Sequence, residues 1–144
     1  MLCRADVGQS LGVGTHGSTY GGNAMACAVA CAALDIVNTP EVLSGVERKR
    51  QRIIEGIQTI DARQGLGLFS EIRGRGLLMG CVLQESWAGR ARDFLTAAQA
   101  EGLMLLVAGA DVSRMAPSLI IPDEDIDEGL RRFARAVESV AGAT

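Results

Sequence analysis

Ten residues near the beginning of the chain, GTHGSTYGGN from Gly14 to Asn23, combine glycines with hydroxyl side chains. Successive backbone N–H groups in such a bend form a concave nest that suits an anion. Ser18 and Thr19 add two hydroxyl donors, and a helix that begins after Asn23 would bring its positive end close to them. The pattern indicates a phosphate site, although a tight turn whose glycines adopt positive φ has the same composition.

Other charged side chains offer fewer chemical roles. His16, the only histidine, has no local carboxylate or nucleophile, so ordinary hydrogen bonding is favoured over a role as general base. Arg73 and Arg75 flank a glycine in IRGRG, where they either grip a carboxylate or are simply exposed. Arg114 lies in an apolar stretch, and a buried arginine needs a partner. Unless Asp111 turns inward, we expect that partner to lie outside this chain.

Lysine and cysteine are too few or too poorly placed for obvious catalysis. Lys49, the only lysine, lies in the charged run ERKRQR, where nothing desolvates it into a nucleophile. Cys27 and Cys31 are one helical turn apart, which suits a metal or a redox pair. They also lie in an alanine-rich run, where cysteine behaves as a small hydrophobe, and we favour that packing role. No zinc-like spacing occurs, so no metal site is predicted.

The totals describe an ordinary globular chain. Its 144 residues are about one domain in length, and 48% of them are hydrophobic. A formal net charge of −3 gives no electrostatic reason to expect nucleic acid. Neither a secretory signal nor a membrane span is predicted. Unpaired cysteines favour a reducing compartment, and so the cytoplasm.

Two helices are predicted first. Residues 24–37 are apolar on all sides, so this helix should be buried on most faces. The next helix begins at Thr39–Pro40, with threonine as its cap and proline in its first turn. Apolar residues repeat along it at helical spacing: Val42, Val46, Ile53, Ile57 and Ile60. Its charged face, which includes Arg48, Lys49 and Arg52, is expected to be solvated.

After Gly65 the pattern changes to short strands mixed with helices. The expected strands are 68–73, 77–83, 103–107, 112–115 and 118–121, and the expected helices are 88–101 and one that starts at Pro122. This order predicts a small α+β domain with one mainly antiparallel sheet, preceded by a segment of a different layer. We place the boundary near Leu43, which divides the chain into residues 1–42 and 43–144.

Three segments resemble one family. GTHGSTYGGNAMACAVA is similar to the loop-and-helix signature of class III pyridoxal-phosphate (PLP) aminotransferases. EIRGRGLLMGCVL and RMAPSLIIPDEDIDEGLRRF resemble its second and its C-terminal landmark, and the order and spacing of all three match across nearly the whole chain. NTPEVLSGV, WAGRAR and IDEGL look most like the acetylornithine/succinylornithine transaminase branch.

The resemblance implies an α/β protein of PLP transferase fold type I, of which this chain is a part. Residues 1–42 would end the large cofactor domain, and residues 43–144 would form the small C-terminal domain. The implied reaction transfers an amino group between an N-acylated ornithine, acetyl or succinyl, and 2-oxoglutarate. The complete enzyme would be a homodimer.

The same resemblance implies roles for three residues. Thr19 would contact the phosphate of a cofactor held mainly by the neighbouring subunit, and Ser18 would lie beside substrate and phosphate at the same boundary. Arg114 would stand at the mouth of the active site, balanced by a glutamate of the large domain. Ala24 replaces the family's usual proline, which a first helical turn tolerates.

No catalytic residue of the family is matched in this chain. The lysine that binds the cofactor covalently, and the aspartate that holds its pyridine nitrogen, belong upstream in the family, and Lys49 does not replace that lysine. The chain alone is therefore expected to be inactive. Two further hypotheses stay open: a non-catalytic remnant or interaction module, and a stand-alone phosphate-binding domain.

Overall fold

The computed structural model describes residues 4–10, 12, 14, 17–65 and 67–142. They fall into two compact units, which meet between Asn38 and Thr39. The division therefore comes after Asn38 rather than after residue 42, at the cap of a helix. The assignment of the first unit to a larger cofactor domain stays a prediction.

The first unit contains α1 (Ala5–Gly8) and α2 (Ala24–Val37). Asn23 caps α2, because its Oδ1 accepts a hydrogen bond from the Ala26 N–H at 2.8 Å. The expectation that α2 is buried on most faces is wrong for this chain, since no residue of the helix is buried. Met25 and Val29 expose 77% and 62% of their surface. An apolar helix needs a covering layer, and within the first unit no described residue supplies one.

The second unit begins with the long helix α3 (Pro40–Gln64). Thr39 Oγ1 accepts the Val42 N–H at 3.3 Å, and Pro40 occupies the first turn, as predicted. Gly65, with φ of +62°, ends the helix in the left-handed conformation that glycine adopts most easily. The predicted apolar stripe is confirmed in the second half of the helix, because Ile53, Ile57 and Ile60 are buried.

The sheet of the second unit is antiparallel throughout its described strands. Its order is β1-β2-β4-β3, with β1 (Phe69–Arg75), β2 (Leu78–Leu83), β3 (Leu106–Val107) and β4 (Val112–Met115). Gly74 near the end of β1 allows this strand to approach β2 closely: its φ is +124°, and a Cβ there would collide with the Leu78 carbonyl oxygen. The predicted antiparallel sheet is thus confirmed.

Two strand predictions need correction. The expected strand at 103–107 shrinks to β3, and residues 118–121 form a turn in which the Ile121 N–H donates to the Ser118 carbonyl at 3.1 Å. Two of the three apolar residues of this turn, Leu119 and Ile121, pack against the core without pairing to a strand, whereas Ile120 is exposed. Their hydrophobicity reflects packing, which sequence periodicity alone cannot separate from strand pairing.

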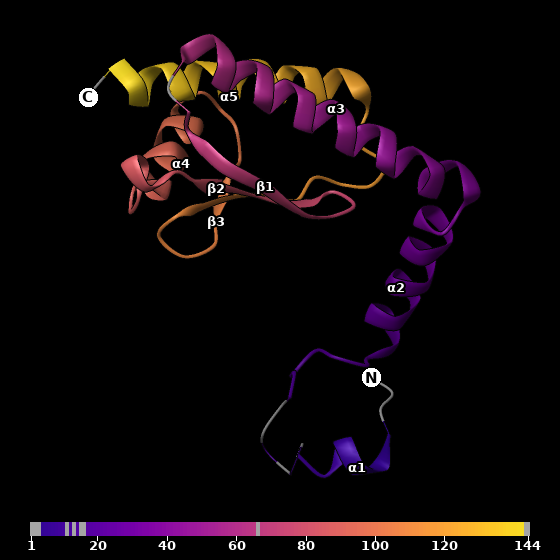
Figure 1. Cartoon of the computed structure of the whole chain (residues 1–144). Helices are drawn as coiled ribbons and strands as arrows, with labels where there is room; N and C mark the ends of the chain where they lie inside the picture. Colours follow the sequence, from indigo (N-terminus) through magenta and orange to yellow (C-terminus); the bar gives the residue numbers. More distant parts are fainter. Residues whose placement is uncertain (1–3, 11, 13, 15–16, 66, 143–144) are drawn as a thin grey trace. The chain divides into compact units, whose positions relative to one another are not determined.

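The helices pack on one face of the sheet (Figure 1). They are α3, α4 (Ala91–Ala100) and α5 (Asp123–Gly142), and a 3₁₀ turn η1 (Glu85–Trp87) precedes α4. Alternate residues of β2, Met79, Cys81 and Leu83, are buried in the same core as Phe94 of α4 and Phe133 of α5. Because side chains alternate along a strand, Leu78, Gly80 and Val82 point to the opposite face.

The charged face of α3 is predicted only to be solvated, but in the structure two of its arginines form ion pairs. Arg48 pairs with Asp123, and Arg52 makes a bidentate pair with Asp127 at 2.7 and 2.6 Å. These pairs join α3 to the beginning of α5. These pairs could not be predicted from the sequence, because the partners are 75 residues apart.

Candidate functional site

The glycine-rich turn before α2 is held by its own side chains. Ser18 Oγ accepts the Gly21 N–H at 3.0 Å, and Asn23 Nδ2 donates to the Tyr20 carbonyl at 2.5 Å. Gly22 has φ of +78°, which side-chain-bearing residues rarely adopt. The turn is therefore followed directly by the N-terminus of a 14-residue helix, α2.

Thr19 lies at the outer side of this turn. It is exposed, and its hydroxyl makes no hydrogen bond with any residue that the structure describes. The Ser18 oxygen accepts a backbone N–H, so the Ser18 hydroxyl proton is still available to donate. Two hydroxyl donors thus lie next to a helix N-terminus, where partial positive charge accumulates.

This donor set fits a phosphate. A phosphate dianion accepts hydrogen bonds from hydroxyl and backbone N–H groups, and a helix N-terminus favours its charge. The turn is also open on its outer side, because a Cβ placed on Gly17 or Gly22 would meet no heavy atom within 4 Å. His16, the candidate base at the beginning of the turn, lies outside the described residues.

Arg114 occupies a different environment from the one predicted. It is exposed on β4, whereas its neighbour Ser113 is completely buried. Strand alternation explains the difference, because Ser113 faces Cys81 of β2 on the helix-covered side and Arg114 faces Gly80 on the other. Asp111 does not pair with it, since its Oδ1 accepts the Gly89 N–H at 2.5 Å. In the described part of the chain, Arg114 has no charged partner.

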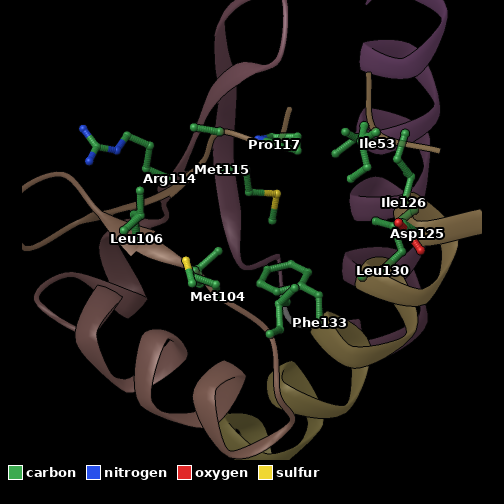
Figure 2. Close-up of a pocket in the computed structure, with 15 residues that line it drawn as sticks. Ile53, Met104, Leu106, Arg114, Met115, Pro117, Asp125, Ile126, Leu130 and Phe133 are labelled. Atoms are coloured by element: carbon green, nitrogen blue, oxygen red, sulfur yellow. The ribbon is translucent and has the colours of Figure 1, made fainter. Parts of the chain in front are cut away.

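An apolar pocket of about 280 Å³ adjoins Arg114. Its wall is formed by the residues around β3, the end of β4 and the first turns of α5, and Figure 2 shows the Arg114 guanidinium at its rim, directed away from the cavity. Asp125 stands at the opposite end. The sequence did not reveal this pocket, because Met104 and Leu106 looked like ordinary strand residues.

Lys49 is engaged in a structural contact. Its Nζ donates to the Leu119 carbonyl oxygen at 2.9 Å, at a partly buried position between α3 and the turn before α5. The contact ties the amine to the backbone of the same unit. That Lys49 does not act as a nucleophile stays a prediction.

Three of the four cysteines lie in the described part of the chain, and these three are free thiols. Cys27 and Cys31 are free and exposed on α2, so the packing role expected for them is not met within this chain. Cys81 is buried, and burial raises the pKa of its thiol to about 12. Among the described residues, no group of three or more potential metal ligands occurs.

The site residues are divided between the units. Ser18 and Thr19 lie together in the first unit and Arg114 lies in the second. Their assembly into one active site stays a prediction.

Comparison with known proteins identifies the family. The family model described as Aminotransferase class-III matches residues 1–137. This chain belongs to the class III aminotransferases. Membership implies PLP as the cofactor.

The most similar relatives include two ornithine-pathway enzymes. The chain is 57% identical over 143 residues to the acetylornithine aminotransferase of Shewanella oneidensis, a match that covers 99% of this chain and 35% of that protein. It is 56% identical over 137 residues to the succinylornithine transaminase/acetylornithine aminotransferase of Pseudomonas aeruginosa, covering 95% and 33%. The chain therefore spans about a third of the length of these relatives.

Solved structures of aminotransferases agree with this family assignment. The N-acetylornithine aminotransferase of Stenotrophomonas maltophilia superposes with a TM-score of 0.80 at 41% identity, over 85% of this chain and 33% of that one. The ornithine aminotransferase of Toxoplasma gondii, described with partial occupancy of PLP at its active site, gives a TM-score of 0.71 at 30% identity, over 96% and 33%. The chain thus has the fold of part of a PLP aminotransferase.

A search for membrane spans found no described helix that is long and apolar enough by itself. The consecutive helices α2 and α3 pass the length and composition test only when taken as a pair.

Proposed function

We propose that this chain is the C-terminal part of a PLP-dependent aminotransferase that transfers an amino group between an N-acylated ornithine and 2-oxoglutarate. The observation that carries the proposal is the similarity to acetylornithine and succinylornithine enzymes over nearly the whole chain. Fold alone would not suffice, because one fold hosts many activities.

The residues of the chain support this function from the edge of the active site. Thr19 donates a hydrogen bond to the cofactor phosphate, and Ser18 donates a second beside the substrate. Arg114 binds a substrate carboxylate at the mouth of the site. PLP, when bound, supplies the electron sink that makes amino-group transfer accessible.

We further propose that the complete enzyme is a cytoplasmic homodimer. The three cysteines that the structure describes are free thiols, which suits a reducing compartment. A dimer follows if Thr19 serves the cofactor of the neighbouring subunit. The exposed apolar surface of α2 is consistent with a covering layer supplied by other parts of the complete enzyme.

The test is glutamate formation. Purified full-length protein with PLP should produce glutamate from 2-oxoglutarate and either acetylornithine or succinylornithine, in proportion to the amino donor consumed. The residue 1–144 chain alone should give none, because its only lysine is held by a backbone carbonyl. Absence of glutamate with both donors would refute the proposal.

An interaction module is the second candidate, favoured by the exposed apolar residues of α2. It predicts that the residue 1–144 chain binds a partner without any PLP-dependent turnover in the full-length protein. The glutamate assay therefore separates the two functions. Site-specific labelling of Lys49 by borohydride and PLP, accompanied by turnover, would contradict the expected inactivity of the chain alone.

A further inference from the structure

Arg73 and Arg114 lie in one cross-strand row of the sheet. Arg73 of β1 is opposite Gly80 of β2, and Gly80 is opposite Arg114 of β4. Residues directly opposite each other in a sheet point to the same face. Strands are spaced about 4.8 Å apart, so the two arginine backbones are separated by roughly 10 Å. Long side chains at that separation can reach one small ligand between them.

This row belongs to the face of the sheet opposite the buried Met79, Cys81 and Leu83. Both arginines are exposed there, and in the described part of the chain neither forms an ion pair or a side-chain hydrogen bond. Glu71 is the nearest carboxylate along β1, on the same face by strand alternation, and no ion pair joins it to Arg73. Two arginines on one face of the sheet, neither of them held in an ion pair, attract an anion.

Gly80 itself contributes no side chain to the row between the two arginines, and the side chains of Val112 and Arg73 lie close to it. A Cβ at this position would lie 3.0 Å from Val112 Cγ1 and 4.0 Å from Arg73 Cγ. The stem of Arg73 therefore extends along the glycine, and a larger residue at position 80 would collide with Val112 and press on this stem.

We propose that Arg73 and Arg114 together bind a carboxylate of the dicarboxylic 2-oxo acid above Gly80. The guanidinium fork matches a carboxylate in two parallel hydrogen bonds, and two forks from opposite sides satisfy both oxygens. Arg73 thereby becomes a substrate-binding residue of the enzyme. The proposal rests on the proposed aminotransferase function and extends it, since that function assigns only Arg114.

The test measures binding of glutarate, which carries both carboxylates but no reactive carbonyl. Calorimetry on the full-length protein in the presence of PLP should show that Arg73→Gln raises the glutarate Kd about tenfold, because a charge-assisted hydrogen bond is lost. Arg73→Lys should recover only part of the affinity, since an ammonium group lacks the fork. The KM for 2-oxoglutarate should rise together with the Kd.

Arg75→Gln is the matched control. It removes the same charge from the same exposed strand, but Arg75 is opposite Leu78 at the end of β1 and does not share the row of Arg114. Its glutarate Kd should change less than twofold. If Arg75→Gln weakens binding as much as Arg73→Gln, only the general positive charge matters and the site is disproved.

The remaining outcomes separate this site from the proposed function. Glutarate affinity that depends on Arg73, in a protein that does not transaminate acylornithines, would support the site and refute that function. The opposite outcome is a protein that transaminates acylornithines but whose glutarate Kd and 2-oxoglutarate KM are unchanged by Arg73→Gln. It would support the proposed function and refute the Arg73 site. Absence of glutarate binding to the unmodified protein would also disprove the site.

Discussion

The hydroxyl of Thr19 provides the sharpest residue-scale prediction. Thr19→Val removes this donor while roughly keeping the side-chain shape. A hydrogen bond to a charged group contributes about 1.5–3 kcal/mol, so the Kd of PLP should rise about tenfold to a hundredfold. Thr19→Ser keeps the donor and should cost much less. Fluorescence titration of full-length protein with PLP measures both.

Thermal unfolding without cofactor is the control for Thr19. Because Thr19 is exposed and its hydroxyl makes no hydrogen bond with a described residue, the melting temperature of Thr19→Val should stay close to that of the unmodified protein. Equal PLP dissociation constants for threonine, serine and valine at position 19 would show that the turn does not bind the cofactor phosphate through this hydroxyl.

Residue types were easier to predict than their surroundings. The donors Ser18 and Thr19 are recognisable from composition, because glycine and hydroxyl side chains before a helix cap are a local pattern. Arg114 is different: whether a strand residue faces the core depends on which side of the sheet the helices cover, and sequence does not reveal that. The expected burial of Arg114 failed for this reason, and the alignment of Arg73 with Gly80 and Arg114 went unseen.

At the element scale, α3 and α5 approach closely at Gly56. A Cβ at Gly56 would lie 2.4 Å from Leu130 Cδ1, whereas a Cβ at Gly45 in the same helix would meet nothing within 4 Å. Gly45→Ala should therefore raise stability by about 0.5–1 kcal/mol, since alanine suits a helix better than glycine. Gly56→Ala should lower it, because overpacking typically costs about 1–3 kcal/mol and exceeds that gain.

Thermal or urea unfolding compares the two alanine variants. In the Leu130→Ala background, where the obstructing methyl groups are absent, Gly56→Ala should no longer destabilise relative to its parent. That non-additivity is the signature of a direct contact. Equal stabilisation by both alanine substitutions would contradict the close packing.

The α3–α5 ion pairs predict a loss of stability in acid. The hydrogen bond from Arg48 holds the pKa of Asp123 below its usual value, and the hydrogen bond from Arg52 does the same for Asp127. A lowered folded-state pKa contributes stability at higher pH, and this contribution disappears as the pH falls from about 4, the unfolded value, through the folded value. Arg52→Gln should reduce this acid dependence.

The control for the ion pairs is Arg63→Gln, which removes a charge from the end of the same helix where no described carboxylate pairs with it. Urea midpoints measured between pH 3 and pH 7 distinguish the variants. An identical pH dependence for Arg52→Gln and the unmodified protein would mean that the exposed pairs are too well screened to matter.

The elements themselves were predicted to different degrees. Helices were accurate because an apolar stripe and a cap are local features, as Thr39 and the buried Ile57 show. The turn at 118–121 was misread as a strand because its apolar residues pack into the core without pairing. The pairs between α3 and α5 could not be foreseen, since sequence spacing says nothing about which helices become neighbours.

On the scale of the whole molecule, α2 indicates how much this chain depends on others. Its apolar residues were predicted to be covered, yet every described residue of the helix is unburied. Exposed apolar surface of this kind favours self-association and poor solubility. The apolar composition of α2 predicted the need for a covering layer, and within the first unit no described residue provides it.

A cofactor contact made across a subunit boundary has a consequence that a contact within one subunit lacks. If Thr19 reaches the phosphate held by the neighbouring subunit, dilution of the enzyme below its dimer dissociation constant should weaken PLP binding. Sedimentation velocity gives the fraction of dimer, and a PLP titration at each concentration should show affinity falling with that fraction. In Thr19→Val the dependence should be weaker, because the contact is already missing. PLP affinity that is independent of protein concentration, or an active monomer, would place Thr19 beside the cofactor of its own subunit.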